Sequence, residues 1–214
     1  QCYKFFTKEF LDFISFPKYF FNSDIRLKSL DVLSEAHAVK KGVILVTSHY
    51  GSFDKLFYAL SKKNYSIAGV AYRQNNSSAD IFFKKIRENF VKNQMYKGGE
   101  IKELKNSLIK NNILILLSDQ DAKNKGVYAK FFGIDSSTHS GAAILSKRYK
   151  CPIIYSGITK KNNFYEVEFI KIDTSGSVSD IVQNYTTEIE KTITQNPEQY
   201  FWFHKRWKSV RKYF

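Results

Sequence analysis

A histidine followed five positions later by an aspartate is a pair of side chains that can do acid–base chemistry. The stretch "VTSHYGSFDKLFYAL" (46–60) places His49 after an apolar run and Asp54 at the start of a helix-like segment. If the chain folds back at Gly51, the Asp54 carboxylate can accept a hydrogen bond from Nδ1–H of His49, which leaves Nε2 free to take a proton. This pair fits a general base that deprotonates a hydroxyl for attack on a thioester carbonyl. The spacing alone fits a structural polar turn as well, and both interpretations stay open.

Short β-branched runs alternate with helix-like segments along the chain, and this alternation predicts the elements that hold the histidine. Buried strands are predicted over 42–49, 66–73, 112–121 and 151–159, and a more exposed strand over 163–172. Helices are predicted within 1–21 and over 25–41, 52–63, 78–93, 100–110, 140–150 and 179–195. The pattern predicts one α/β domain over 1–214, with three layers and a mostly parallel sheet flanked by helices. The stretch 120–139 is predicted to be a long functional loop.

Polar residues follow several of the predicted strands, at the edge where ligands bind in open α/β sheets. Arg73 ends the second strand, and its guanidinium suits a phosphate, although a solvated surface arginine is the alternative. Asp119 and Gln120 follow the third strand, where they either line the substrate site or form a turn. Arg148 also suits a phosphate, or is a surface charge.

Charge and composition limit the partners of the chain. Lys and Arg number 34 against 20 Asp and Glu, a net charge of +14, which suits nucleic acid, an anionic membrane surface or a phosphorylated substrate. Aromatic residues make up 16%, and the mixture of aromatic and basic residues favours the membrane surface. No RNP, KH or zinc-finger string is present, so we expect no nucleic-acid partner. His and Cys lack ligand spacing and no dinucleotide or P-loop motif occurs, so we expect neither metal nor cofactor.

The first 21 residues hold nine aromatic side chains, several of them at helical spacing. They predict a helix that either packs on the core or lies partly in the lipid headgroup layer. No run of 18 apolar residues occurs, so we expect no helix of this chain to span a bilayer.

Four stretches carry a family resemblance: "GVILVTSHYGSFD", "VAYRQNNSSADIFFKKIREN", "LSDQDAKNKGVYAKFFG" and "NPEQYFWFHKRWK". Together they resemble the late acyltransferases of lipid A assembly, the lauroyl/myristoyl transferases within the lysophospholipid acyltransferase group. The last stretch is the most specific of the four. Most lipid A members have Glu at the position of Asp54. Glycerolipid members have Asp there, as this chain does. A glycerolipid acyltransferase is therefore the rival enzyme, and the last stretch argues against it.

The resemblance implies a membrane-associated enzyme that moves a fatty acyl chain from acyl carrier protein to a hydroxyl of a phosphorylated glycolipid, the lipid A precursor. It implies a position at the cytoplasmic face of the bacterial inner membrane, with an upstream membrane anchor that this chain does not include. His49 would be the base, Asp54 its partner and Arg73 a phosphate ligand. The last stretch contributes four further substrate-binding candidates, which alternatively pack the C-terminal segment onto the domain: Glu198, Trp202, His204 and Arg206.

Overall fold

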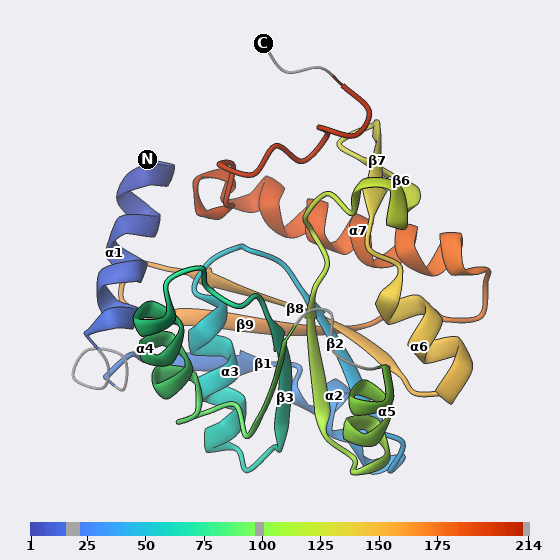
Figure 1. Cartoon of the computed structure of the whole chain (residues 1–214), viewed down its shortest axis with the longest axis horizontal. Helices are drawn as coiled ribbons and strands as arrows, with labels where there is room; N and C mark the ends of the chain where they lie inside the picture. Colours follow the sequence, from blue (N-terminus) through green and yellow to red (C-terminus); the bar gives the residue numbers. More distant parts are fainter. Residues whose placement is uncertain (16–21, 97–100, 212–214) are drawn as a thin grey trace.

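The computed structural model describes residues 1–15, 22–96 and 101–211 (Figure 1). Among these residues, seven strands form one sheet in the order β1-β9-β8-β2-β5-β3-β4, and β6 and β7 form a separate hairpin. The central strands are β2 (Val43–Thr47), β5 (Ile113–Leu117), β3 (Ile67–Ala71) and β8 (Ile153–Lys160). Neighbouring strands in the sheet run parallel, except for β8 and β9 (Tyr165–Lys171). The predicted mostly parallel sheet is therefore confirmed.

Helices cover both faces of the sheet, which gives the three layers expected (Figure 1). One core lies beneath α5 (Ile101–Ile109), α6 (Gly141–Tyr149) and α7 (Val178–Gln195). The other lies beneath α1 (Cys2–Ile14), α2 (Leu30–Ala38), α3 (Phe53–Lys62) and α4 (Ser77–Arg87). Apolar side chains alternate between these cores along each central strand, because successive residues of a strand face opposite sides of the sheet.

Three segments differ from the sequence-based expectation. The segment 25–41 was predicted to be one helix, but its first residues form strand β1 (Ile25–Lys28) and the helix α2 follows. The residues of β1 alternate between apolar and charged and pair with β9 at the sheet edge. The predicted helix 78–93 ends at Arg87, and β4 (Asn93–Tyr96) follows it as the opposite edge strand. The predicted loop 120–139 contains the hairpin of β6 (Val127–Phe131) and β7 (Ile134–Thr138). Short edge strands and a short hairpin are weak signals in a sequence, because tertiary pairing rather than local propensity stabilises them.

The N-terminal segment packs on the domain through α1, and the part of the predicted helix over 16–21 lies outside the described residues. Glu9 and Phe13 are buried, whereas Phe10 and Leu11 are each 53% exposed. No helix of the described residues is long and apolar enough to cross a membrane.

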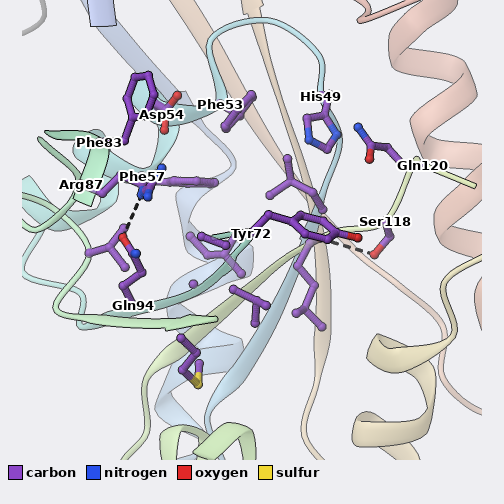
Figure 2. Close-up of a pocket in the computed structure, with 18 of the residues that line it drawn as sticks. His49, Phe53, Asp54, Phe57, Tyr72, Phe83, Arg87, Gln94, Ser118 and Gln120 are labelled. Atoms are coloured by element: carbon purple, nitrogen blue, oxygen red, sulfur yellow. Dashed lines mark hydrogen bonds between the residues drawn. The ribbon is translucent and has the colours of Figure 1, made fainter. Parts of the chain in front are cut away.

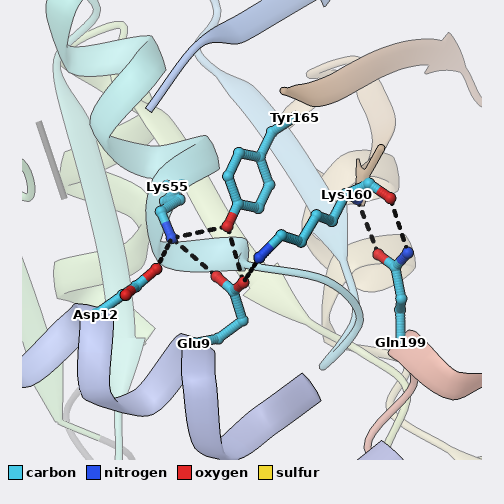
Figure 3. A network of polar contacts seen from close by, with 6 residues as sticks. All are labelled: Glu9, Asp12, Lys55, Lys160, Tyr165 and Gln199. Carbon is cyan, nitrogen blue, oxygen red and sulfur yellow. Dashed lines mark hydrogen bonds and ion pairs between the residues drawn. The ribbon is translucent and has the colours of Figure 1, made fainter. Parts of the chain in front are cut away.

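A buried charged network fixes α1 against α3 (Figure 3). The ammonium group of Lys55, which is fully buried, donates to Glu9 at 2.8 Å, to Asp12 at 3.2 Å and to the Tyr165 hydroxyl at 3.1 Å. Lys160 donates to the other Glu9 oxygen at 2.9 Å. Burial alone would raise the pKa of Glu9, but the charge and hydrogen bonds of Lys55 and Lys160 lower it below its usual value.

We expect Lys55→Met to lower the free energy of unfolding by about 3 kcal/mol, because it leaves the Glu9 carboxylate buried without its main counter-charge. Urea denaturation at neutral pH measures this effect, with Lys62→Met on the exposed surface of the same helix as the control. Since the folded-state pKa of Glu9 is lowered, its contribution is present above its unfolded pKa and is lost as the pH falls through the folded pKa. Equal destabilisation by both substitutions would contradict this role of the network.

Candidate active site

The loop after β2 turns sharply so that His49 lies at the carboxyl edge of the sheet. Gly51 has φ +59°, and a Cβ built there would lie 1.8 Å from the carbonyl oxygen of Ile158. Its N–H donates to the carbonyl of Gln199 at 2.8 Å. Only glycine combines this backbone conformation with such a close approach, so Gly51 sets the path of the loop.

The orienting partner of His49 is Asp119. Nδ1 of His49 lies 2.9 Å from Oδ1 of Asp119, which is 2% exposed. The contact follows from strand register. β2 and β5 are parallel neighbours in which Thr47 pairs with Leu117, and His49 and Asp119 each lie two positions beyond that pair. The carboxylate accepts from Nδ1–H, which fixes the neutral tautomer with its lone pair on Nε2. Among the described residues no hydrogen bond to Nε2 is present, and the ring borders a cavity.

The two groups shift each other's titration. Burial disfavours the charged imidazole, but the attraction and hydrogen bond of Asp119 outweigh burial, and the pKa of His49 is raised above its usual value. Burial likewise opposes ionisation of Asp119, but the charge and hydrogen bonds of His49 lower the pKa of Asp119. The arrangement therefore holds a carboxylate against the ring and stabilises the imidazolium that forms when Nε2 takes a proton.

Asp54 does not make the expected hydrogen bond to Nδ1 of His49, because Asp119 occupies that position. Asp54 lies in the first turn of α3 and lines the cavity, and Figure 2 shows the Phe53 ring between it and His49. Burial raises the pKa of Asp54 to about 7, although Arg87, His49 and Lys55 act in the opposite direction. In the described structure, the interaction of Asp54 with His49 is electrostatic rather than a direct hydrogen bond.

The stretch "NPEQYFWFHKRWK" (196–208), here called the C-terminal signature, supports the loop that carries the histidine. The N–H of Phe201 donates to the carbonyl of His49 at 2.9 Å, and Tyr200 pairs with Tyr50 in a β-bridge. The rings of Phe53 and Phe201 flank the imidazole, with centroids 5.6 and 6.2 Å from it. Residues far apart in the sequence thus form one frame around His49.

The four substrate-binding candidates of that signature have mainly structural contacts. Arg206 is 1% exposed and donates to the Ser137 carbonyl at 2.6 Å and the Thr138 hydroxyl at 2.5 Å, so it anchors the β6–β7 hairpin and does not reach the cavity. Nε2 of His204 accepts from the N–H of Asp121 at 3.0 Å. The packing alternative therefore describes both residues.

The remaining two candidates lie in the turn beside the loop of His49. The indole N–H of Trp202, a residue 40% exposed, donates to the Pro197 carbonyl at 2.7 Å. Glu198 is half-buried in the 3₁₀ turn Pro197–Gln199. Neither lines the cavity beside His49.

Of the other candidates, Gln120 lies beside the histidine, whereas neither Arg73 nor Arg148 is among the residues that line the cavity. Gln120 lines the cavity, and Figure 2 shows its amide beside the imidazole. Arg73 is exposed at the carboxyl end of β3, with its guanidinium 4.6 Å from the centre of the Tyr96 ring. Arg148 lies in the last turn of α6, next to the start of β8 and thus near the opposite edge of the sheet, and it does not line this cavity.

The cavity beside His49 has a volume of about 790 Å³ and borders both cores of the domain. β3 pairs with β5 only from Ile67 to Gly69. Beyond Gly69 the two strands are no longer paired with each other: β3 continues beside β4, and β5 continues beside β2. Leu116 and Leu117 both line the cavity although they face opposite sides of the sheet. A space of this size, lined mainly by aromatic and aliphatic side chains, suits a hydrocarbon chain.

Sequence reasoning missed two polar groups at this cavity. Arg87 and Gln94 line it, and Nε of Arg87 donates to Oε1 of Gln94 at 2.8 Å (Figure 2). Arg87 lies within the second family-like stretch but carries no special spacing there, and Gln94 lies in β4, which was not predicted. Among the described residues, no cluster of three or more His, Cys, Asp or Glu side chains could hold a metal ion.

Comparisons with known proteins agree with the site. Residues 2–209 match the family described as bacterial lipid A biosynthesis acyltransferase. The chain is 26% identical over 191 residues to "Lipid A biosynthesis palmitoleoyltransferase" of Escherichia coli (strain K12), covering 86% of this chain and 61% of that protein. It has the same identity and coverage with "Lipid A biosynthesis acyltransferase" of Shigella flexneri, so it spans about three fifths of the length of both relatives. A histidine hydrogen-bonded to a buried acid lies beside an apolar cavity, and the family matches almost the whole chain: this chain belongs to the bacterial lipid A biosynthesis acyltransferase family.

Proposed function

We propose that this chain is the catalytic domain of an acyltransferase that moves a fatty acyl group from acyl carrier protein to a hydroxyl of a phosphorylated lipid A precursor. The observation that carries the proposal is the hydrogen bond of His49 Nδ1 to buried Asp119, with the ring facing an apolar cavity. The family match over residues 2–209 supports a lipid A-type acceptor.

The reaction needs one base and no enzyme nucleophile. Nε2 of His49 takes the proton of the acceptor hydroxyl as its oxygen attacks the thioester carbonyl, and Asp119 stabilises the resulting imidazolium. When the tetrahedral intermediate collapses, the carbon–sulfur bond breaks and the imidazolium returns the proton to the thiolate of the carrier. The ester forms and His49 is again neutral, so the proton balance closes.

The negative oxygen of the intermediate needs hydrogen-bond donors. α3 starts beside His49, its N-cap Ser52 makes no side-chain cap, and no hydrogen bond from the Phe53 or Asp54 N–H to a described residue is present. These groups also lie at the positive end of the helix dipole. We assign the oxyanion site to this first turn; one such donor contributes about 3–4 kcal/mol in enzymes of known mechanism.

The surface around the cavity suits a lipid headgroup layer. Tyr3, Phe10 and Phe203 are 75%, 53% and 39% exposed, and Phe6 and Phe10 also line the cavity. With the net charge of +14, these exposed rings support association with an anionic membrane surface at the cytoplasmic face of the inner membrane.

We expect His49→Ala to abolish acyl transfer, because it removes the base at Nε2 that takes the proton of the acceptor hydroxyl. Transfer from an acyl carrier protein thioester to a lipid A precursor, followed by mass spectrometry, measures the loss. His37→Ala is the control, since His37 bonds to the Asn111 carbonyl in another part of the domain. Full activity of a folded His49→Ala protein would remove the mechanism.

We expect Asp119→Asn to lower kcat by roughly 10²–10⁴-fold, because the amide neither fixes the tautomer nor stabilises the imidazolium. Activity should rise with pH through the pKa of His49, since the neutral ring is the base. Removing the charge that raises this pKa should move the rise to lower pH. Asp54→Asn should move it less, because its effect on His49 is the smaller one. A larger loss in Asp54→Asn than in Asp119→Asn would contradict the assignment of the orienting acid.

We expect Arg73→Ala to raise KM for the phosphorylated acceptor about tenfold and leave kcat nearly unchanged, because Arg73 would hold a phosphate away from the reacting atoms. Arg26→Ala is the control, because Arg26 is exposed on the edge strand β1 and pairs with Asp24. Steady-state kinetics with a precursor that lacks the phosphate separates the two roles: that substrate should be insensitive to Arg73→Ala.

A further inference from the structure

Inside the mainly apolar cavity, three polar side chains form a cluster that the mechanism above does not use. Nη2 of Arg87 and Nε2 of Gln94 are buried and have no hydrogen-bond partner among the described residues. The side chains are joined by the 2.8 Å bond from Arg87 Nε to Gln94 Oε1, so both unpaired donors have a fixed position. Asp54 lines the same cavity, and among the neighbouring charges that of Arg87 favours its ionised form most.

Buried donors without partners are rare, because an unmade hydrogen bond in a dry environment is costly. In a cavity built for substrate, such donors indicate an acceptor atom carried by the substrate itself. An unbroken hydrocarbon chain would leave both donors unpaired. An anionic group would be attracted by Arg87 but repelled by an ionised Asp54, so the cluster favours a neutral group.

A hydroxyl can both accept and donate, as the cluster requires. Its oxygen has two lone pairs, which can accept from Arg87 and Gln94, and its one proton can be donated to the Asp54 carboxylate. We propose that the cluster of Asp54, Arg87 and Gln94 binds a hydroxyl on the donor's acyl chain, an inference that rests on the acyl transfer proposed above. The enzyme then prefers a hydroxylated acyl donor to an unsubstituted one.

The hydroxyl bound here is distinct from the one that reacts. The reacting acceptor oxygen must lie at Nε2 of His49, and in the view of Figure 2 the cluster and the imidazole lie on opposite sides of Phe53. Burial raises the pKa of Asp54 to about 7, so this acid is partly ionised at neutral pH, and in its ionised form it acts only as an acceptor for the proton of a hydroxyl. The cluster thus recognises a substituent along the chain rather than the chain end that reacts.

The binding test uses acyl N-acetylcysteamine thioesters of equal length, one unsubstituted and the others with a single hydroxyl moved along the chain. Each competes with a fluorescent fatty acid for His49→Ala protein, so no turnover is needed. We expect one hydroxyl position to bind about 10- to 100-fold more tightly than the unsubstituted chain. Equal affinity for every member of the series would overturn the proposal.

Two substitutions of Gln94 separate recognition from packing. Gln94→Leu removes the donor and the acceptor, whereas Gln94→Glu removes the donor and keeps an oxygen for Arg87 Nε. Both should lose the preference for the hydroxylated chain, while Gln74→Leu, at an exposed position of the cavity lining, should keep it. If Gln94→Leu lost the preference for the hydroxylated chain but Gln94→Glu kept it in full, the effect would be one of packing, and the proposal would be overturned.

Kinetics with the corresponding acyl carrier protein donors distinguishes this proposal from the proposed function. Transfer of both donor types, with kcat/KM higher for the hydroxylated one, supports both. Equal transfer of both types overturns hydroxyl recognition and leaves the acyltransferase function intact. Binding selectivity without any transfer to a lipid A precursor overturns the proposed function and leaves the hydroxyl site intact.

Discussion

The parallel register between β2 and β5 is the constraint on which the site depends. Thr47 at the end of β2 pairs with Leu117 at the end of β5. The two segments leave the sheet side by side, so that the residues two positions beyond this pair face each other. One of these is His49 and the other is Asp119, joined at 2.9 Å. A shift of one residue would turn these side chains to the other face, so the chemistry relies on the register that the two cores enforce.

Segments from both ends of the chain hold this pair in place. The C-terminal signature bonds to the backbone on both sides of Tyr50 through Phe201 and Gln199. Gln199 in turn exchanges two hydrogen bonds with the backbone of Lys160, whose ammonium reaches Glu9 of α1. In the described structure the signature therefore supports the loop of His49. The charged network and the histidine loop are parts of one connected structure.

The sequence was sufficient for the three-layer architecture, because its central strands are continuous apolar runs that need no partner to be recognised. It was sufficient for the position of His49 as well, since ligand sites in such sheets follow strand ends. The orienting acid was assigned to Asp54 because sequence proximity was used in place of spatial order. If the strands 43–47 and 113–117 were known to be neighbours, Asp119 would have been the expected partner of His49. The local sequence of neither strand reveals their order in the sheet. Arg206 looked like a ligand because a charged residue in a signature suggests function, whereas its burial beneath the hairpin depends on the fold of 120–139.

The short pairing between β3 and β5 has a consequence for the sheet itself. Only three residue pairs join the β3–β4 edge to the remaining strands, and the cavity begins where this pairing stops. The two halves of the sheet are therefore separated at their carboxyl ends by a seam rather than closed by a backbone ladder. Whatever occupies the seam touches both layers of helices at once, and the sheet that divides most α/β domains into two independent interiors here leaves a passage between them.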